Sequence, residues 1–151
     1  MKEGDLTKRD EVQNQEKFKQ RILFEGLIRK DRITPTDIDG FIDYKGKAFV
    51  FLEAKTGEAD MKYGQKLAYI NLIQTLKKAG TDAICILFKH NTPSHQHIKA
   101  SEQEVDSIYM FDEKDEFWIW KVPSKPINVV QALDTFEKKC LKKGIKIFKN
   151  M

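Results

Sequence analysis

The chain has 151 residues, of which 40% are hydrophobic and 11% aromatic, and it carries a formal net charge of +4. This composition excludes a disordered chain and is typical of one domain, residues 1–151, around a single core. No apolar stretch approaches the roughly 20 residues of a membrane-spanning helix, the N-terminus is too polar for a signal peptide, and two cysteines give no disulfide framework, so we expect a soluble cytoplasmic protein.

A helix is predicted over residues 10–28. The residues that recur there at helical spacing are Phe18, Ile22, Glu25 and Ile28. Glu25 is the odd member of this otherwise apolar stripe. Extended chain is expected around Pro35, because the residue before a proline avoids the helical region.

A β-hairpin and a second helix follow. Strand-like runs at 37–43 and 47–55 flank the turn-forming residues 44–46 and predict the hairpin. The second helix is predicted over 60–78, and Gly80 is suited to end it in a left-handed conformation.

The second half of the chain predicts three strands and a helix. The run 81–89 is continuously apolar at its centre, which is typical of a strand covered on both faces. Further strands are predicted at 106–111 and 116–122, and an amphipathic helix at 127–143. The element order α, β, β, α, β, β, β, α predicts an α/β fold with a mixed central sheet flanked by helices.

The hairpin loop decides which charged side chains meet. A two-residue turn would put Asp39 and Glu53 on opposite faces, and it requires a positive φ at Lys45, which a residue with a Cβ disfavours. We therefore predict a three-residue loop at 44–46 that pairs Asp37 with Glu53. The charged side chains that then share one face are Asp37, Asp39, Glu53 and Lys55.

Charges at the end of an apolar hairpin must be paired or must hold a metal, because desolvating them alone is costly. One interpretation is a salt bridge of Lys55 with Glu53 or Asp39 on an exposed strand end. The other is a functional site.

The net charge is unevenly distributed along the chain. Residues 125–151 carry +5, residues 1–32 carry +2, and residues 33–124 carry −3. Carboxylates that hold a metal repel phosphate, so a protein that uses both needs basic residues nearby. The alternative is that the C-terminal lysines are only solvated.

Two sequence runs and one helix carry a family resemblance. The runs are TDIDGFI at 36–42 and EAKTG at 53–57, and Gln65 and Tyr69 follow on the helix. This ordered set of a strand Asp, a Glu-x-Lys strand and a Gln-x-x-x-Tyr helix resembles the PD-(D/E)XK nuclease superfamily, in its RecB-like branch. The resemblance covers about residues 14–90 and implies a restriction-endonuclease-like core of the αβββαβ type.

The resemblance implies a Mg²⁺ or Mn²⁺ site made of oxygen ligands. Asp39 and Glu53 would supply the metal carboxylates, and the backbone carbonyl of Ala54 a further ligand. Glu25 matches the helix glutamate that completes such a site directly or through metal-bound water. Asp37 is an extra acid, so which aspartate is the main ligand stays open.

The resemblance also implies catalytic roles. Lys55 would position or deprotonate the attacking water, and Gln65 would orient Lys55 or the substrate. The full catalytic set is Asp39, Glu53, Lys55, Gln65 and Glu25.

Nucleic acid would be held by basic side chains around this site. The expected contacts are Lys62, Lys66 and Tyr69 on the second helix and Lys142 and Lys143 near the C-terminus. Tyr69 lies one helical turn from Gln65, so it either reaches the site or packs in the core.

The implied function is metal-dependent hydrolysis of DNA phosphodiester bonds, in DNA repair, recombination or phage DNA processing, within a bacterial cell or a phage-infected host. The sequence does not choose between exonuclease, endonuclease and junction resolvase. A domain this small has no room for a long threading channel, so processive or double-strand cutting would need a homo-oligomer. The alternative is a noncatalytic nucleic-acid-binding or protein-interaction module that keeps a nuclease fold.

Two further groups of residues have simpler explanations. His90, His95 and His97 lack the ligand spacing of a metal site and predict a polar loop. Trp118 and Trp120 share one strand face and are expected to cover a core or a partner rather than to stack on bases.

Overall fold

The computed structural model describes residues 22–149, and the chain divides into two compact units after Pro35. The described part of the first unit, residues 22–35, contains a turn at Glu25 and Gly26 and the short 3-10 helix η1 (Lys30–Arg32). The second unit contains the sheet and both α-helices. The contacts that build the sheet, the core and the site all lie within this second unit.

The helix predicted over 10–28 is wrong for residues 22–28, and residues 10–21 lie outside the described part of the chain. Gly26 has a φ of 78°, and the Leu27 N–H donates to the Phe24 carbonyl at 3.1 Å, a turn bond rather than a helical one. Sequence periodicity alone does not hold a helix together, because most helical stability comes from a packed face. Glu25 therefore lies in an exposed turn.

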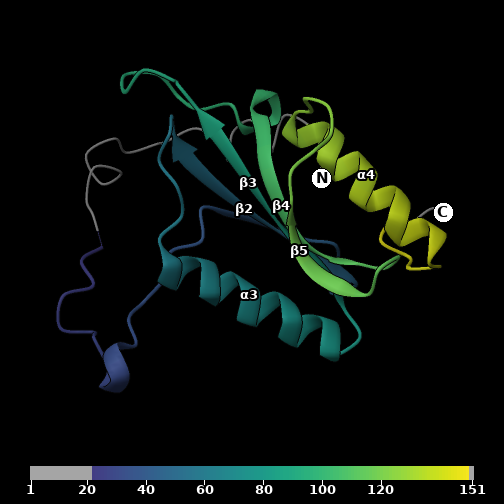
Figure 1. The fold of residues 1–151 in the computed structure, drawn as a ribbon, viewed down its shortest axis with the longest axis horizontal. Coiled ribbons are helices and arrows are strands. Elements are labelled where there is room, and N and C mark those ends of the chain that lie inside the picture. Colours follow the sequence, from purple (N-terminus) through teal and green to yellow (C-terminus); the bar gives the residue numbers. More distant parts are fainter. Residues whose placement is uncertain (1–21, 150–151) are drawn as a thin grey trace. The chain divides into compact units, whose positions relative to one another are not determined.

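A five-stranded mixed sheet forms the centre of the second unit (Figure 1). Its strands run in chain order across the sheet: β1 (Gly40–Asp43), β2 (Ala48–Thr56), β3 (Asp82–His90), β4 (Glu104–Asp112) and β5 (Phe117–Lys121). Strands β2 and β3 are parallel, and the other neighbours are antiparallel. The predicted α/β class with a mixed sheet is confirmed.

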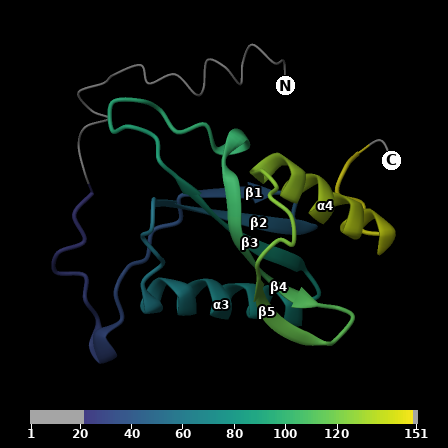
Figure 2. The same cartoon turned by 45° about the horizontal axis from the view of Figure 1, so that its top comes forward.

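Two helices cover opposite faces of the sheet (Figure 2). Helix α3 (Tyr63–Lys78) is the crossover between β2 and β3, and helix α4 (Val129–Lys142) follows β5. As predicted, α3 ends before a left-handed Gly80, at φ 87°. Asn128 caps α4, because its side chain accepts the Gln131 N–H at 2.8 Å. No helix in the described part of the chain is both long and apolar enough to cross a membrane.

The alternation of β2 divides the core into two clusters. Phe51 faces α3 and packs with Tyr69, whereas Val50 faces α4 and packs with Phe136 in a second cluster. Strand β3 is buried on both faces from residue 83 to residue 88, as its apolar run predicts. Trp118 and Trp120 cover Tyr109 on the α3 face, with ring centroids at 5.4 and 5.1 Å, so their core role is confirmed.

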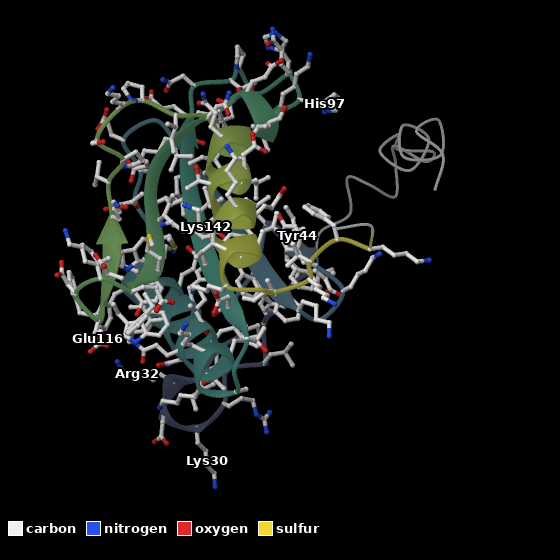
Figure 3. The ribbon with its side chains drawn as sticks, turned by 90° about the vertical axis from the view of Figure 1, so that its right-hand side faces the viewer. Lys30, Arg32, Tyr44, His97, Glu116 and Lys142 are labelled. Carbon is white, nitrogen blue, oxygen red and sulfur yellow. The ribbon has the colours of Figure 1, made fainter. Side chains whose placement is uncertain are left out.

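Tyr44 ties the hairpin to α4, and Figure 3 shows it beside that helix. Its hydroxyl donates to the Glu137 carboxylate at 2.8 Å, and its ring packs against Phe136. Burial, with Glu137 acting in the same direction, raises the pKa of the Tyr44 hydroxyl, so this donor stays protonated at neutral pH.

The predicted register of the hairpin is wrong by two residues, but the faces are correct. The Tyr44 N–H donates to the Ala48 carbonyl at 3.0 Å, so the loop comprises residues 45–47 rather than 44–46. Asp43 pairs with Phe49 and Gly40 with Leu52. A shift of two residues keeps every side chain on its face, because strands alternate with a period of two. Lys45 adopts the positive φ, 56°, that we expected it to avoid.

We predict that Lys45→Gly stabilises the protein by about 0.5–1 kcal/mol, because glycine relieves the left-handed strain at some cost in unfolded-chain entropy. Chemical denaturation would measure the free energy of unfolding. Lys47→Gly is the matched control, since Lys47 is not among the residues with a positive φ, and it should lower stability. Equal effects of the two substitutions would contradict the loop geometry.

Candidate functional site

Five side chains predicted from the sequence come together at the end of β2, beneath the first turns of α3. We call them the carboxylate–lysine site: Asp39, Glu53, Lys55, Gln65 and Tyr69. Glu53 is its centre, because it is the one charged side chain that is buried among the described residues, with 2% of its surface exposed. The site therefore depends on how the fold compensates this carboxylate.

Three donors surround the Glu53 carboxylate. The Tyr69 hydroxyl donates to Oε2 at 2.6 Å, and the Gln65 amide donates to Oε1 at 2.7 Å. The Lys55 ammonium lies 3.4 Å from the same Oε1. A carboxylate can accept about four hydrogen bonds, so Glu53 keeps acceptor capacity beyond these contacts.

The periodicities of two elements build this arrangement. Glu53 and Lys55 are two apart on β2 and point to the same face, toward α3. Gln65 and Tyr69 are four apart on α3, so both face the sheet from successive turns. Ile73, one turn further, is fully buried and anchors the helix. The Gln-x-x-x-Tyr spacing therefore supplies two donors to one carboxylate.

Asp39 lies just before β1 and is exposed. Its Oδ2 accepts the Ala54 backbone N–H at 2.9 Å. Continuing the register from Gly40 and Leu52 by one residue puts Asp39 opposite Glu53, on the same face of the sheet. The predicted meeting of these two carboxylates is confirmed, although Asp37 was expected to be the partner opposite Glu53.

The electrostatics of the site reflect its burial. Desolvation is the largest cause and raises the pKa of Glu53, and the nearby Asp39 charge acts in the same direction. The bonds from Tyr69 and Gln65 and the Lys55 charge oppose this rise. Burial, followed by the bond to Glu53, raises the pKa of the Tyr69 hydroxyl, so Tyr69 remains the donor in this pair.

The remaining predicted ligands differ in position. Ala54 follows Glu53 on β2, with its side chain toward α4. Asp37 is exposed in the irregular segment before β1 and forms no hydrogen bond or ion pair with any described residue. Glu25 lies in the exposed turn of the first unit, and its role in the site stays a prediction.

The predicted nucleic-acid contacts fall on both faces of the sheet. Lys62 is exposed immediately before α3, at the end of the helix that carries Gln65. Lys66 is half-buried, with its ammonium 5.5 Å from the centre of the Trp120 ring. Lys142 and Lys143 lie at the end of α4, on the opposite face, and Lys143 is paired with Asp82 at the start of β3.

The structure adds a residue that sequence reasoning missed. Lys89 of β3 pairs in register with Lys55 of β2, and its ammonium lies 3.4 Å from the Asp106 carboxylate. The available signal was a lysine that ends an apolar strand. Its proximity to Lys55 depends on β2 and β3 being parallel neighbours, which the sequence pattern does not specify.

The donor set has the chemistry of a hard-cation site with few protein ligands. Two carboxylates, Asp39 and Glu53, and the Ala54 carbonyl are oxygen donors that Mg²⁺ and Mn²⁺ accept. Within residues 22–149 no group of three acidic, histidine or cysteine side chains is placed to hold a metal. Mg²⁺ in proteins commonly uses one or two carboxylates and keeps several waters, so the donor set fits a Mg²⁺ ion completed by water and substrate.

Comparisons of the chain with protein-family models, with curated proteins and with solved structures found no match. Function is therefore inferred from the residues of the carboxylate–lysine site and their geometry.

We predict that Glu53 gives stability a distinctive pH dependence. The folded state holds the Glu53 proton more tightly than the unfolded chain, whose pKa is near the ordinary 4.5. The Glu53 contribution to the free energy of unfolding is therefore largest below pH 4.5, falls as the pH rises through the raised pKa, and is constant above it. Glu53→Gln should remove this fall.

Denaturant titrations of both proteins across this pH range, in buffer with a metal chelator, would measure the effect. The difference between the two proteins isolates Glu53 from carboxylates such as Asp82, whose lowered pKa gives the opposite slope. Parallel stability curves for the two proteins would contradict the raised pKa.

Proposed function

We propose that this protein is a Mg²⁺- or Mn²⁺-dependent deoxyribonuclease that hydrolyses phosphodiester bonds at the carboxylate–lysine site. The observation that carries the proposal is the buried Glu53 carboxylate, held by Gln65 and Tyr69 next to Lys55 and Asp39. A buried charge surrounded by donors from another element is expensive to assemble. Such an arrangement favours a site over a surface ion pair.

The competing structural explanation was a salt bridge on an exposed strand end. Lys55 and Glu53 do form an ion pair, but Glu53 is 2% exposed and Lys55 22% exposed. Replacing such a buried pair by apolar residues is often neutral or stabilising. Protein stability alone therefore does not explain why the Glu53 carboxylate, the Gln65 amide and the Tyr69 hydroxyl meet at this site.

Each side chain has a distinct task in the proposed reaction. Asp39 and Glu53 would hold the cation, which when bound polarises the phosphate and lowers the pKa of water. The Lys55 ammonium would sit beside the attacked phosphate and stabilise its developing negative charge. Gln65 and Tyr69 would position Glu53, whose carboxylate keeps acceptor capacity beyond these two bonds. Phosphodiester hydrolysis needs little more than this positioning and charge stabilisation.

The topology is compatible with the nuclease core in its central part. A hairpin that bears the acidic residues is followed by α3 and by a strand parallel to β2. The expected αβββαβ order has three strands before the second helix, whereas the described residues contain two. The observed order therefore supports the proposed nuclease core over its ββαβ centre. It gives no support for the first helix of that core or for its third strand.

The substrate would approach the α3 face, where Lys62 is exposed beside the site. Lys142 and Lys143 belong to the other face and are not expected to contact the same stretch of DNA. The proposed setting is the reducing cytoplasm of a bacterial or phage-infected cell. In support, Cys85 and Cys140 are both buried as free thiols in the two clusters on opposite faces of the sheet.

We predict that Glu53→Gln and Lys55→Met each lower DNA cleavage by about 100-fold or more while leaving the fold intact. The first removes a metal carboxylate, and the second removes the charge next to the phosphate. Cleavage of linear, nicked, branched and single-stranded DNA would be measured with Mg²⁺ and with Mn²⁺. Circular dichroism would check that each variant is folded.

Lys47→Met is the matched control, because Lys47 is an exposed lysine in the hairpin loop at the other end of β2. It should cleave like the wild-type protein. A wild-type protein that leaves all four substrates intact with both ions would contradict the enzyme and favour the alternative, a noncatalytic module with a nuclease fold.

We also predict that Lys62→Ala weakens DNA binding and reduces by about one the slope of log affinity against log salt concentration. The physical reason is the loss of one phosphate contact. Anisotropy of a labelled duplex, in chelator to prevent cleavage, would measure both quantities. Lys142→Ala should leave the slope unchanged, and a larger effect of Lys142→Ala than of Lys62→Ala would place DNA on the wrong face for this proposal.

A further inference from the structure

A groove of about 800 Å³ lies on the α4 face of the sheet, away from the carboxylate–lysine site. It runs between α4 and strands β3, β4 and β5, and Figure 3 looks onto this face with Lys142 labelled on α4. Its volume is in the range of sites that hold small ligands or short peptide segments. We call it the α4 groove.

The floor of the α4 groove is apolar. It is made of side chains from the two central strands, the segment before α4 and α4 itself: Ile84, Ile108, Met110, Ile127, Ala132 and Phe136. Most are aliphatic, and Phe136 is only 7% exposed. Two half-buried rings, Phe111 and Trp118, also line the groove, but Lys77 lies over the Phe111 ring and Trp118 stacks on Tyr109. Aliphatic walls suit branched or aliphatic side chains, whereas single-stranded nucleic acid is held by exposed aromatic faces.

The rim of the α4 groove is basic. Its lysines come from the β4–β5 turn, from β5, from the following loop and from α4: Lys114, Lys121, Lys125, Lys139 and Lys142. None of the five forms an ion pair with a described residue. Asp112 is the one acidic lining residue outside the ion-pair network described next, and its side chain caps the β4–β5 turn.

An ion-pair network forms part of the lining of the α4 groove. Lys143 and Lys77 both contact Asp82 and Glu113, with Lys143 2.7 Å from Asp82 and Lys77 3.0 Å from Glu113. These two bases and two acids neutralise each other. The unbalanced positive charge of the groove therefore belongs to the rim lysines.

Two of the rim lysines, Lys121 and Lys139, are close enough to repel each other. Burial lowers the pKa of Lys139, and the positive charges of Lys121 and Lys143 lower it further, against the opposing effect of Asp112 and Glu113. Like charges held together are destabilising unless an anion joins them. Because the uncompensated lysines come from four segments around the groove, they match several negative charges spread along a ligand rather than one anionic group.

We propose that the α4 groove binds a short acidic segment of a partner protein, with one or two apolar side chains on the aliphatic floor and its carboxylates against the lysine rim. The spread of the lysines matches a row of carboxylates, and the mainly aliphatic floor, with a face of Phe111 and of Trp118 already in contact with Lys77 and Tyr109, favours this occupant over nucleic acid. The proposal does not depend on the nuclease, because the groove and the carboxylate–lysine site lie on opposite faces of the sheet.

The test uses a fluorescent hexapeptide of four aspartates followed by isoleucine and phenylalanine, with anisotropy as the readout. The wild-type protein should bind it, with affinity that falls as salt rises. Lys121→Glu combined with Lys139→Glu should weaken binding about tenfold or more, because two attractive contacts become repulsive. Replacing both apolar residues of the peptide by serine should weaken binding without altering the protein.

The matched control is Lys138→Glu combined with Lys146→Glu, which changes the net charge equally at exposed positions outside the groove. It should bind the hexapeptide nearly as well as the wild-type protein. Absence of peptide binding, or equal losses in the two double variants, would overturn the proposal. A labelled twelve-nucleotide oligothymidine that binds the wild-type protein more tightly than the hexapeptide does, and that loses binding in Lys121→Glu/Lys139→Glu, would overturn it in favour of a nucleic-acid groove.

Discussion

The burial of Glu53 is the constraint on which the arrangement of this molecule depends. A carboxylate with 2% of its surface exposed must be compensated, and the fold does so with Gln65 and Tyr69 from α3 and Lys55 from its own strand. This fixes the rotation of α3 about its axis, because only one helix face carries both donors. It also fixes the depth of the helix on the sheet, since Tyr69 reaches Glu53 and packs on Phe51 at the same time. Site and core are therefore built by the same contacts.

The sequence predicts the parts of this arrangement that depend on residues close together in the chain, and it does not predict the parts that depend on distant residues. Periodicity places four of the five site residues correctly, because faces of strands and helices are local properties. It also gives the face of Asp39 despite the wrong register, since the error was an even number of residues. The loop was misplaced because Lys45 accepts a left-handed backbone, which depends on how the flanking strands pair. The prediction of a first helix is wrong over residues 22–28, because the apolar residues that recur there have no packed surface to stabilise a helix.

Other features of the site need long-range pairing that a single sequence does not contain. Lys89 lies beside Lys55 because β2 and β3 are parallel neighbours joined by α3. The C-terminal lysines were grouped with the site by charge alone, and the fold puts them behind the sheet with α4. The distribution of charge along the sequence shows how many lysines a segment carries. The face of the sheet on which those lysines lie is decided by how their helix packs.

The sheet itself therefore separates two charged regions that the sequence mixes. Odd-numbered residues of β2 direct acidic and basic groups toward α3, while even-numbered residues form the apolar layer beneath α4. If the proposed metal carboxylates and the lysine rim shared a face, they would neutralise each other, and each would repel the ligand that the other attracts. The sheet and the core cluster on each of its faces hold them apart, so ligands of opposite charge would meet different fields on the two sides. The net charge of +4 therefore conceals two regions of different chemistry on opposite faces of the sheet.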